Sequence, residues 1–124
     1  MRYDAVIFDL GNTLAGILSN TPWGSPAEPW REELARHGLL DAVDAGVFCR
    51  DVGWRKSDPR PFEFICRTLG VRPASCLFVG DDPRWDLAGA RAVGMDARLI
   101  DRIGAAHPPG ENALRSLDDL LLAL

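Results

Sequence analysis

Short apolar runs alternate along this chain with longer segments in which apolar positions recur at helical spacing. The short runs predict five buried strands, because each is only a few residues long and rich in β-forming side chains. They are Tyr3–Phe8, Ala15–Leu18, Val47–Cys49, Cys76–Val79 and Ala97–Ile100. Alternation of such strands with helices is typical of an α/β fold with a mainly parallel sheet.

Four segments carry helix signals, in which a capping residue or a proline precedes the apolar periodicity and a glycine follows it. In the first, Ser25 stands as an N-cap with a glutamate three residues later, an arrangement typical of a capping box. The predicted helices start at Ser25, Asp58, Pro83 and Ser116, and the first three end at Gly38, Gly70 and Gly94.

Composition predicts one globular domain, residues 1–124, with 47% apolar and 26% charged residues. The net charge of −4 offers no basic surface for nucleic acid. No apolar run is long enough for a membrane span. Three cysteines without a CxxC pair favour a reducing compartment, and the opening MRYDAVIFDL is too acidic for a signal peptide. We therefore expect a cytoplasmic protein.

Polar side chains follow the ends of the predicted strands. They are Asp9 after the first strand, Ser19 and Asn20 after the second, Lys56 a few residues after the third, and Asp81, Asp82 and Asp86 after the fourth. Ligands of parallel sheets bind beyond the carboxyl ends of the strands, so we expect these groups to converge there. Carboxylates are the ligands that Mg²⁺ prefers, and a carboxylate can also attack phosphorus. The pattern favours a phosphorylated substrate with a divalent cation.

Each of these residues also has a purely structural interpretation. A single aspartate after a strand is usually a turn residue or a helix cap, and Asp82 before Pro83 is well explained as an N-cap. A single lysine such as Lys56 is usually a solvated side chain. Their joint position on several strand ends is what favours a functional site.

Four stretches resemble the motifs of the haloacid dehalogenase superfamily of hydrolases, which are mostly phosphatases. FDLGNTL is similar to the first motif, ILSN to the second, VGWRKSDPRPFE to the third and LFVGDDPRWDLAGARAVGM to the fourth. The resemblance extends from about residue 3 to about residue 103. It implies a Rossmann-like core, with a mainly parallel sheet of about five strands flanked by helices.

The resemblance also implies roles for individual residues. Asp9 would be the nucleophile, and Lys56 would steady both the nucleophile and the phosphate. Ser19 and Asn20, together with Lys56, would contact the phosphate of a small substrate. A Mg²⁺ ion would be held by Asp9, the backbone carbonyl of Gly11, Asp81 and Asp86.

Two features depart from the family pattern. Gly11 occupies the position where a second aspartate usually acts as general acid/base, a contribution of typically about 10²–10⁴-fold. The cap domain that usually separates the first two motifs is absent, because only a handful of residues lie between them.

These departures leave three functions open. The first is a Mg²⁺-dependent phosphatase acting through an aspartyl-phosphate on Asp9. The second is a catalytically impaired binding or interaction protein of the same fold, favoured by Gly11 and the missing cap. The third is a 2-haloacid dehalogenase, which also lacks the second aspartate but needs no metal and leaves the acids of GDDPRWD unexplained.

The short junction raises a problem of topology. A five-residue strand is about 16 Å long, and a parallel crossover normally takes about a dozen residues. Parallel first and second strands therefore look incompatible with a junction confined to residues 10–16. We expect instead a second strand that folds back antiparallel, a strand-swapped homodimer, or a shortened form of a longer parent.

Overall fold

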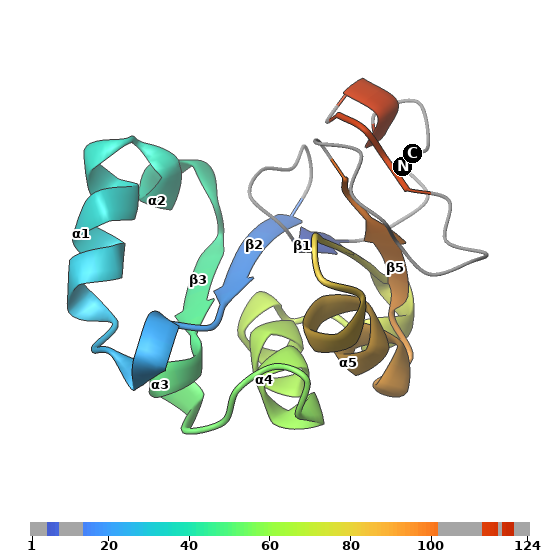
Figure 1. The fold of residues 1–124 in the computed structure, drawn as a ribbon, viewed down its shortest axis with the longest axis horizontal. Helices are drawn as coiled ribbons and strands as arrows, with labels where there is room; N and C mark the ends of the chain where they lie inside the picture. The colour runs from blue at the N-terminus through green and yellow to red at the C-terminus, as the bar shows by residue number, and fades with distance from the viewer. Residues whose placement is uncertain (1–4, 8–13, 102–112, 117, 121–124) are drawn as a thin grey trace.

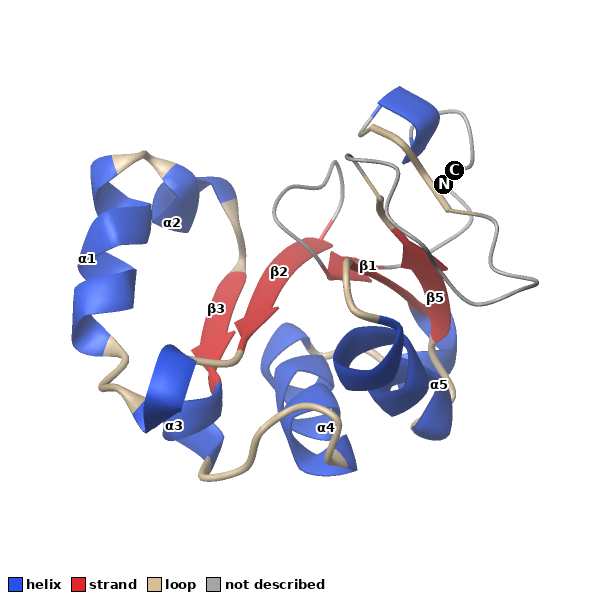
Figure 2. Ribbon diagram, in the orientation of Figure 1, coloured by secondary structure: helices blue, strands red, loops and turns tan. Residues whose placement is uncertain are grey.

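The computed structural model describes residues 5–7, 14–101, 113–116 and 118–120. Within these ranges five strands form one sheet in the order β3-β2-β1-β4-β5 (Figure 1; Figure 2). The strands are β1 (Ala5–Ile7), β2 (Leu14–Ser19), β3 (Ala45–Phe48), β4 (Cys76–Gly80) and β5 (Asp96–Leu99). All neighbouring pairs are parallel, so the carboxyl ends of all five strands face one edge. The predicted α/β fold with a parallel sheet is confirmed.

Helices flank this sheet. They are α1 (Glu28–Arg36), α2 (Leu39–Ala42), α3 (Cys49–Val52), α4 (Pro59–Leu69) and α5 (Gly89–Ala92), the last preceded by a π-helical turn at Pro83–Ala88. Figure 1 shows α4 and α5 side by side beneath the sheet, with α1 and α2 beyond its β3 edge. No helix in these ranges is long and apolar enough to cross a membrane.

The main core lies between the sheet and α4. Phe62 and Ile65, one turn apart on α4, are fully buried against β2 and β4. The rings of Phe62 and Phe78 meet edge to face, with centroids 5.1 Å apart and planes at 67°, a geometry that aromatic pairs favour. Because strand side chains alternate between faces, Leu77 and Val79 of β4 point the other way, toward Leu114 and Leu120.

A charged contact attaches α1 to the edge of the sheet. Arg31 donates a hydrogen bond of 3.0 Å to Asp51, and its guanidinium lies 5.0 Å from the centre of the Phe48 ring. Partial burial opposes ionisation of Asp51, but hydrogen bonds from Arg31 and from the Phe48 backbone N–H, together with the positive charge of Arg31, outweigh it and lower the pKa of Asp51.

Local capping follows the sequence at α4 but not at α1. Asp58 caps α4 by accepting a hydrogen bond of 2.9 Å from the Arg60 N–H. The predicted cap at Ser25 is wrong, because α1 begins at Glu28 without a side-chain cap. The Ser25 hydroxyl instead accepts a hydrogen bond of 3.1 Å from the indole N–H of Trp30.

The junction between the first two strands contradicts the predicted fold-back. β1 and β2 of the same chain are parallel, with Ala5 opposite Leu14 and Ile7 opposite Gly16. The antiparallel arrangement is wrong, and the pairing requires no second copy. The described part of β1, Ala5–Ile7, has three residues rather than the five assumed above. The return from Ile7 to Leu14 therefore covers only about 7 Å along the strands and about 5 Å across them, within the reach of six connecting residues.

We predict that Gly89→Ala destabilises the protein despite the higher helix propensity of alanine. Gly89 has helical backbone angles, φ −64° and ψ −45°, where alanine would normally stabilise by about 1 kcal/mol. Here a Cβ atom would overlap the buried Phe62 ring and lie 3.1 Å from the Cα of Ser57. Overpacking of this kind costs about 1–3 kcal/mol, which a urea titration of the free energy of unfolding would measure.

The double variant Gly89→Ala/Phe62→Leu serves as the control for this prediction. If the clash with Phe62 is the cause, the two substitutions together cost less than the sum of their separate effects. A stabilising Gly89→Ala, or strictly additive effects, would contradict the proposed contact.

Candidate active site

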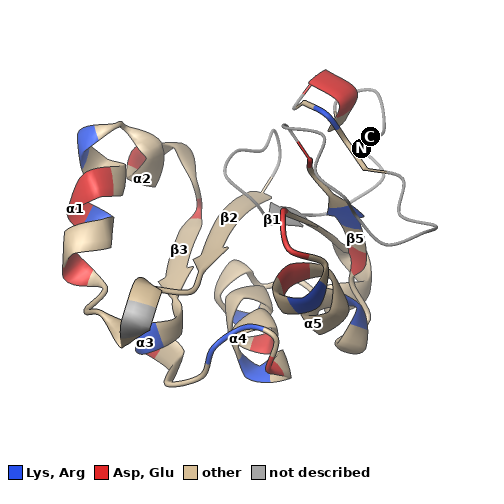
Figure 3. Cartoon of the chain, in the orientation of Figure 1, with Lys and Arg blue, Asp and Glu red and all other residues tan. Residues whose placement is uncertain are grey.

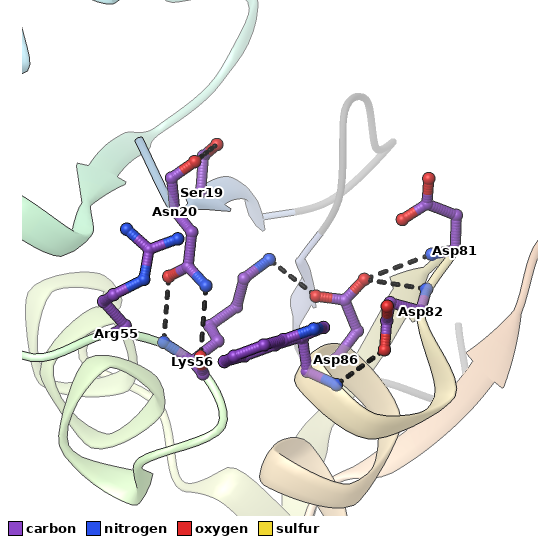
Figure 4. A pocket seen from close by; sticks show the side chains of 8 residues that line it. Ser19, Asn20, Arg55, Lys56, Asp81, Asp82 and Asp86 are labelled. Atoms are coloured by element: carbon purple, nitrogen blue, oxygen red, sulfur yellow. Dashed lines mark hydrogen bonds and ion pairs between the residues drawn. The ribbon is translucent and has the colours of Figure 1, made fainter. Parts of the chain in front are cut away.

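A pocket of about 320 Å³ lies at the carboxyl edge of the sheet (Figure 4). It receives side chains from the end of β2, the loop between α3 and α4, and the segment after β4. The lining residues are Ser19, Asn20, Arg55, Lys56, Asp81, Asp82, Trp85 and Asp86. Volumes of this size accommodate small ligands.

Asn20 joins the end of β2 to the loop that carries Lys56. Its side-chain amide donates a hydrogen bond of 3.1 Å to the carbonyl of Lys56, and its side-chain oxygen accepts one of 2.9 Å from the N–H of the same residue. Both ends of the amide are therefore engaged with the backbone. Asn20 positions Lys56 in the pocket, which is a structural role beside the predicted contact with phosphate.

Lys56 forms a buried ion pair at the centre of the pocket. Its Nζ lies 2.6 Å from Oδ1 of Asp86, and the side chains of the two residues are 11% and 7% exposed. The same Nζ donates a hydrogen bond of 3.1 Å to the carbonyl of Leu18 and lies 5.5 Å from the centre of the Phe78 ring. The ammonium group is thus held in one place, next to the ends of β2 and β4.

The second carboxylate oxygen of Asp86 closes the turn after β4. Its Oδ2 accepts hydrogen bonds from the backbone N–H groups of Asp81, at 3.1 Å, and Asp82, at 3.2 Å. A Cβ atom at Gly80 would overlap this carboxylate, so the glycine provides the space for it. Both oxygens of Asp86 are consequently occupied by partners within the protein.

The turn that presents Asp86 is capped as the sequence predicts. Oδ1 of Asp82 accepts hydrogen bonds of 2.8 Å from the N–H groups of Arg84 and Trp85. The Asp82 carbonyl accepts from Leu87 at 3.3 Å, five residues on, which makes the turn π-helical. Single π-turns of this kind are frequent at functional sites.

Opposite charges face each other across the pocket. The loop before α4 contributes Arg55 and Lys56, and the segment after β4 contributes three aspartates. In Figure 3 the loop before α4 carries a blue stretch, and the chain after β4 begins with a red one. Asp81 is exposed, and within the described residues its carboxylate has no protein partner, although its backbone N–H is bonded to Asp86.

The described residues alone do not make a metal site. No group of three or more His, Cys, Asp or Glu side chains in the described part of the chain is arranged to hold an ion. Of the predicted ligands, Asp86 is occupied by Lys56 and the backbone, whereas the Asp81 carboxylate is available. Asp9 and Gly11 lie outside the described residues. A hard cation such as Mg²⁺ prefers carboxylate oxygens, so Asp81 fits as one ligand of such an ion.

Five of the seven predicted site residues meet in this pocket: Ser19, Asn20, Lys56, Asp81 and Asp86. Their proximity is observed, and their individual roles in catalysis remain predictions. Sequence reasoning overlooked Arg55, which also lines the pocket. The signal was available, because Arg55 directly precedes Lys56 within the third motif.

Comparison with known proteins identifies the family to which the chain belongs. A family model described as haloacid dehalogenase-like hydrolase matches residues 15–94, which include every described residue of the pocket. The chain belongs to the haloacid dehalogenase-like hydrolases. The predicted membership of this superfamily is therefore confirmed.

Several members of the haloacid dehalogenase-like hydrolases are similar to the chain. Phosphatase MT3486 of Mycobacterium tuberculosis is 36% identical over 86% of this chain and 47% of its own length. (S)-2-haloacid dehalogenase 1 of a Pseudomonas species is 33% identical over 75% of this chain and 42% of its own length. The crystal structure of a HAD phosphatase from Thermococcus onnurineus superimposes with a TM-score of 0.80 at 31% identity, covering 90% of this chain and 50% of that one.

The chain thus spans about half the length of the relatives that it matches. The similarity extends over most of this chain, and the matched relatives include both phosphatases and dehalogenases. These similarities establish the family but not the reaction.

We predict that Asp86→Ala is strongly destabilising. The change leaves Lys56 buried without its counter-charge and frees two backbone N–H groups, and breaking a buried pair costs about 3–5 kcal/mol. Glu33→Ala is the matched control, because Glu33 pairs with Arg36 and His37 on the exposed face of α1, where such pairs contribute less than about 1 kcal/mol. Urea unfolding of both variants measures the difference. Equal losses would show that the pair at the pocket is as weak as the surface one.

Proposed function

We propose that this chain forms the core of a Mg²⁺-dependent phosphatase that acts on a small phosphate ester. In the proposed reaction, a carboxylate oxygen of Asp9 attacks phosphorus, the P–O bond to the alcohol oxygen breaks, and that oxygen takes a proton from water as it leaves. Water then attacks the aspartyl-phosphate, which releases inorganic phosphate and restores the carboxylate.

The observation that supports this proposal is the fixed position of Lys56. Its ammonium group lies between Ser19 at the end of β2 and the aspartates after β4, in a pocket that faces the carboxyl edge of the sheet. A positioned cation at this place stabilises charge that develops on a transferring phosphate. The Ser19 hydroxyl, on the same pocket wall, supplies a neutral donor to a phosphate oxygen.

Mg²⁺ is proposed to bind at Asp81, together with Asp9 and the carbonyl of Gly11. When bound, the ion neutralises negative charge shared between the carboxylates and the phosphate. Asp86 is proposed to position the site rather than to bind the ion. One of its oxygens pairs with the Lys56 ammonium, and the other accepts a hydrogen bond from the backbone N–H of Asp81.

A 2-haloacid dehalogenase is the second candidate. It is favoured by the 33% identity to (S)-2-haloacid dehalogenase 1 and by Gly11, which stands where the phosphatases of the family usually have their second aspartate. The exposed carboxylate of Asp81, which has no partner among the described residues, favours the phosphatase, because a metal-free reaction gives that carboxylate no task.

We predict Mg²⁺-dependent release of phosphate from p-nitrophenyl phosphate, and its loss in Asp9→Asn. The amide has the same shape as the carboxylate but is a far weaker nucleophile. Asp41→Asn is the control, because Asp41 lies on α2 and does not line the pocket. No release by the folded protein would favour the impaired binding protein, and chloride release from 2-chloropropionate without added metal would favour the dehalogenase.

We predict that Mg²⁺ raises the melting temperature and that Asp81→Ala removes this effect. A ligand that binds only the folded state stabilises it, by about 1.4 kcal/mol at ten times its Kd, which corresponds to about 3–6 °C in a domain of this size. Thermal melts with 0–10 mM MgCl₂, with Asp41→Ala as control, measure the shift. An unchanged melting temperature, or a shift that survives Asp81→Ala, would remove Asp81 from the metal site.

A further inference from the structure

Arg55 is a second cation at the pocket, and it is held differently from Lys56. Its Nη1 donates a hydrogen bond of 2.7 Å to the carbonyl of Thr21, a residue only 1% exposed, and lies 3.8 Å from Sγ of Cys49. The loop that carries Arg55 is also fixed by the two hydrogen bonds between Asn20 and the Lys56 backbone. The guanidinium therefore stands in a defined position although the residue is exposed.

The two cations differ in charge balance. Lys56 is neutralised by Asp86 at 2.6 Å. Arg55 has no carboxylate partner among the described residues, and only its Nη1 is bonded. Figure 4 shows Arg55 beside Asn20, on the opposite side of the pocket from the aspartates that follow β4. Of these two cations, Arg55 is thus the one without a counter-charge among the described residues.

The free part of the guanidinium has the shape of a carboxylate receptor. Its Nε and Nη2 groups have no partner among the described residues, and together they form a planar fork of parallel donors. Such a fork binds carboxylates through two charge-assisted hydrogen bonds. Because Arg55 and Lys56 are adjacent in the chain and line one pocket, a single small molecule can reach both.

We propose that Arg55 is a specificity-determining residue that binds a carboxylate of the substrate next to its phosphate. The proposal rests on the phosphatase function proposed above and defines its substrate class as phosphate esters of small hydroxy acids. Lys56 and its surroundings receive the phosphate, and Arg55 receives the carboxylate. A purely structural role, in which Arg55 only ties its loop to Thr21, would produce no preference between charged and uncharged ligands.

Binding rather than turnover tests the proposal, so its outcome does not depend on the reaction. The probes are phosphonoacetate, which carries a phosphonate and a carboxylate, and phosphonoacetamide, in which an uncharged amide replaces the carboxylate. Isothermal titration in the presence of MgCl₂ gives the Kd of each. We expect the intact protein to prefer phosphonoacetate by about 10–100-fold, the usual range for hydrogen bonds between charged groups.

Three variants locate the preference. Arg55→Gln should reduce it to less than about threefold, and Arg55→Lys should retain part of it, because lysine keeps the charge but not the fork. Arg50→Gln is the matched control: Arg50 also anchors its Nη1 on a backbone carbonyl, that of Gly24 at 2.8 Å, but does not line the pocket. It should leave the preference unchanged. Thermal melts confirm that each variant is folded.

The outcomes separate this proposal from the proposed function. Equal binding of the two probes by the intact protein, no binding of either, or equal weakening of both in Arg55→Gln would overturn the role of Arg55, even if phosphate esters are hydrolysed. A preference that Arg55→Gln abolishes would support that role, even if the phosphatase assay gives no turnover.

Discussion

The ion pair between Lys56 and Asp86 is the interaction on which the pocket depends. Each partner comes from a different part of the chain, Lys56 from the loop before α4 and Asp86 from the turn after β4. Taking two charges out of water is costly, and their attraction compensates only when the geometry is good and the remaining donors and acceptors are satisfied. Here Leu18 and two backbone N–H groups provide those partners. The pair therefore fixes the relative positions of β2, β4 and the two loops.

The contacts that form the pocket, including this ion pair, do not depend on the short connection between β1 and β2. The walls of the pocket are built by residues 19–20, 55–56 and 81–86, which contact one another directly. None of these contacts involves a covering domain. The geometry of the charged groups is consequently a property of the sheet edge itself, and any covering segment would act on access to the pocket.

Most of the fold was predictable because its signals are local. Apolar runs and capping residues predicted all five strands and the start of α4 at Asp58. The parallel pairing of β1 and β2 was not predicted, because the rule that was applied assumes a strand of about five residues, whereas the described part of β1 has three. The failed cap at Ser25 has a similar origin, since its hydroxyl found a side-chain partner, Trp30, that the capping pattern does not consider.

The sequence predicted most of the residues that line the pocket, but not the contacts that they make. Positions after strand ends predicted the convergence of Ser19, Lys56 and the aspartates after β4, since parallel strands share an edge. No spacing rule predicts that both oxygens of Asp86 bind within the protein, one to Lys56 and one to the backbone. Nor does any rule predict that Arg55 is anchored by the carbonyl of Thr21, 34 residues away. Those facts depend on three-dimensional contacts between segments distant in the sequence.

The π-turn that begins at Asp82 constrains how this sequence can change over time. It holds one residue more than an α-helical turn, and each residue advances a helix by about 100°. Loss or gain of a single residue between Asp82 and Leu87 would rotate the buried Asp86 away from Lys56 and the Asp81 backbone. A neighbour such as the exposed Trp85 would then take its position. Substitutions at the exposed positions of the turn do not change the direction in which Asp86 points. The segment can therefore drift in composition while its length stays fixed.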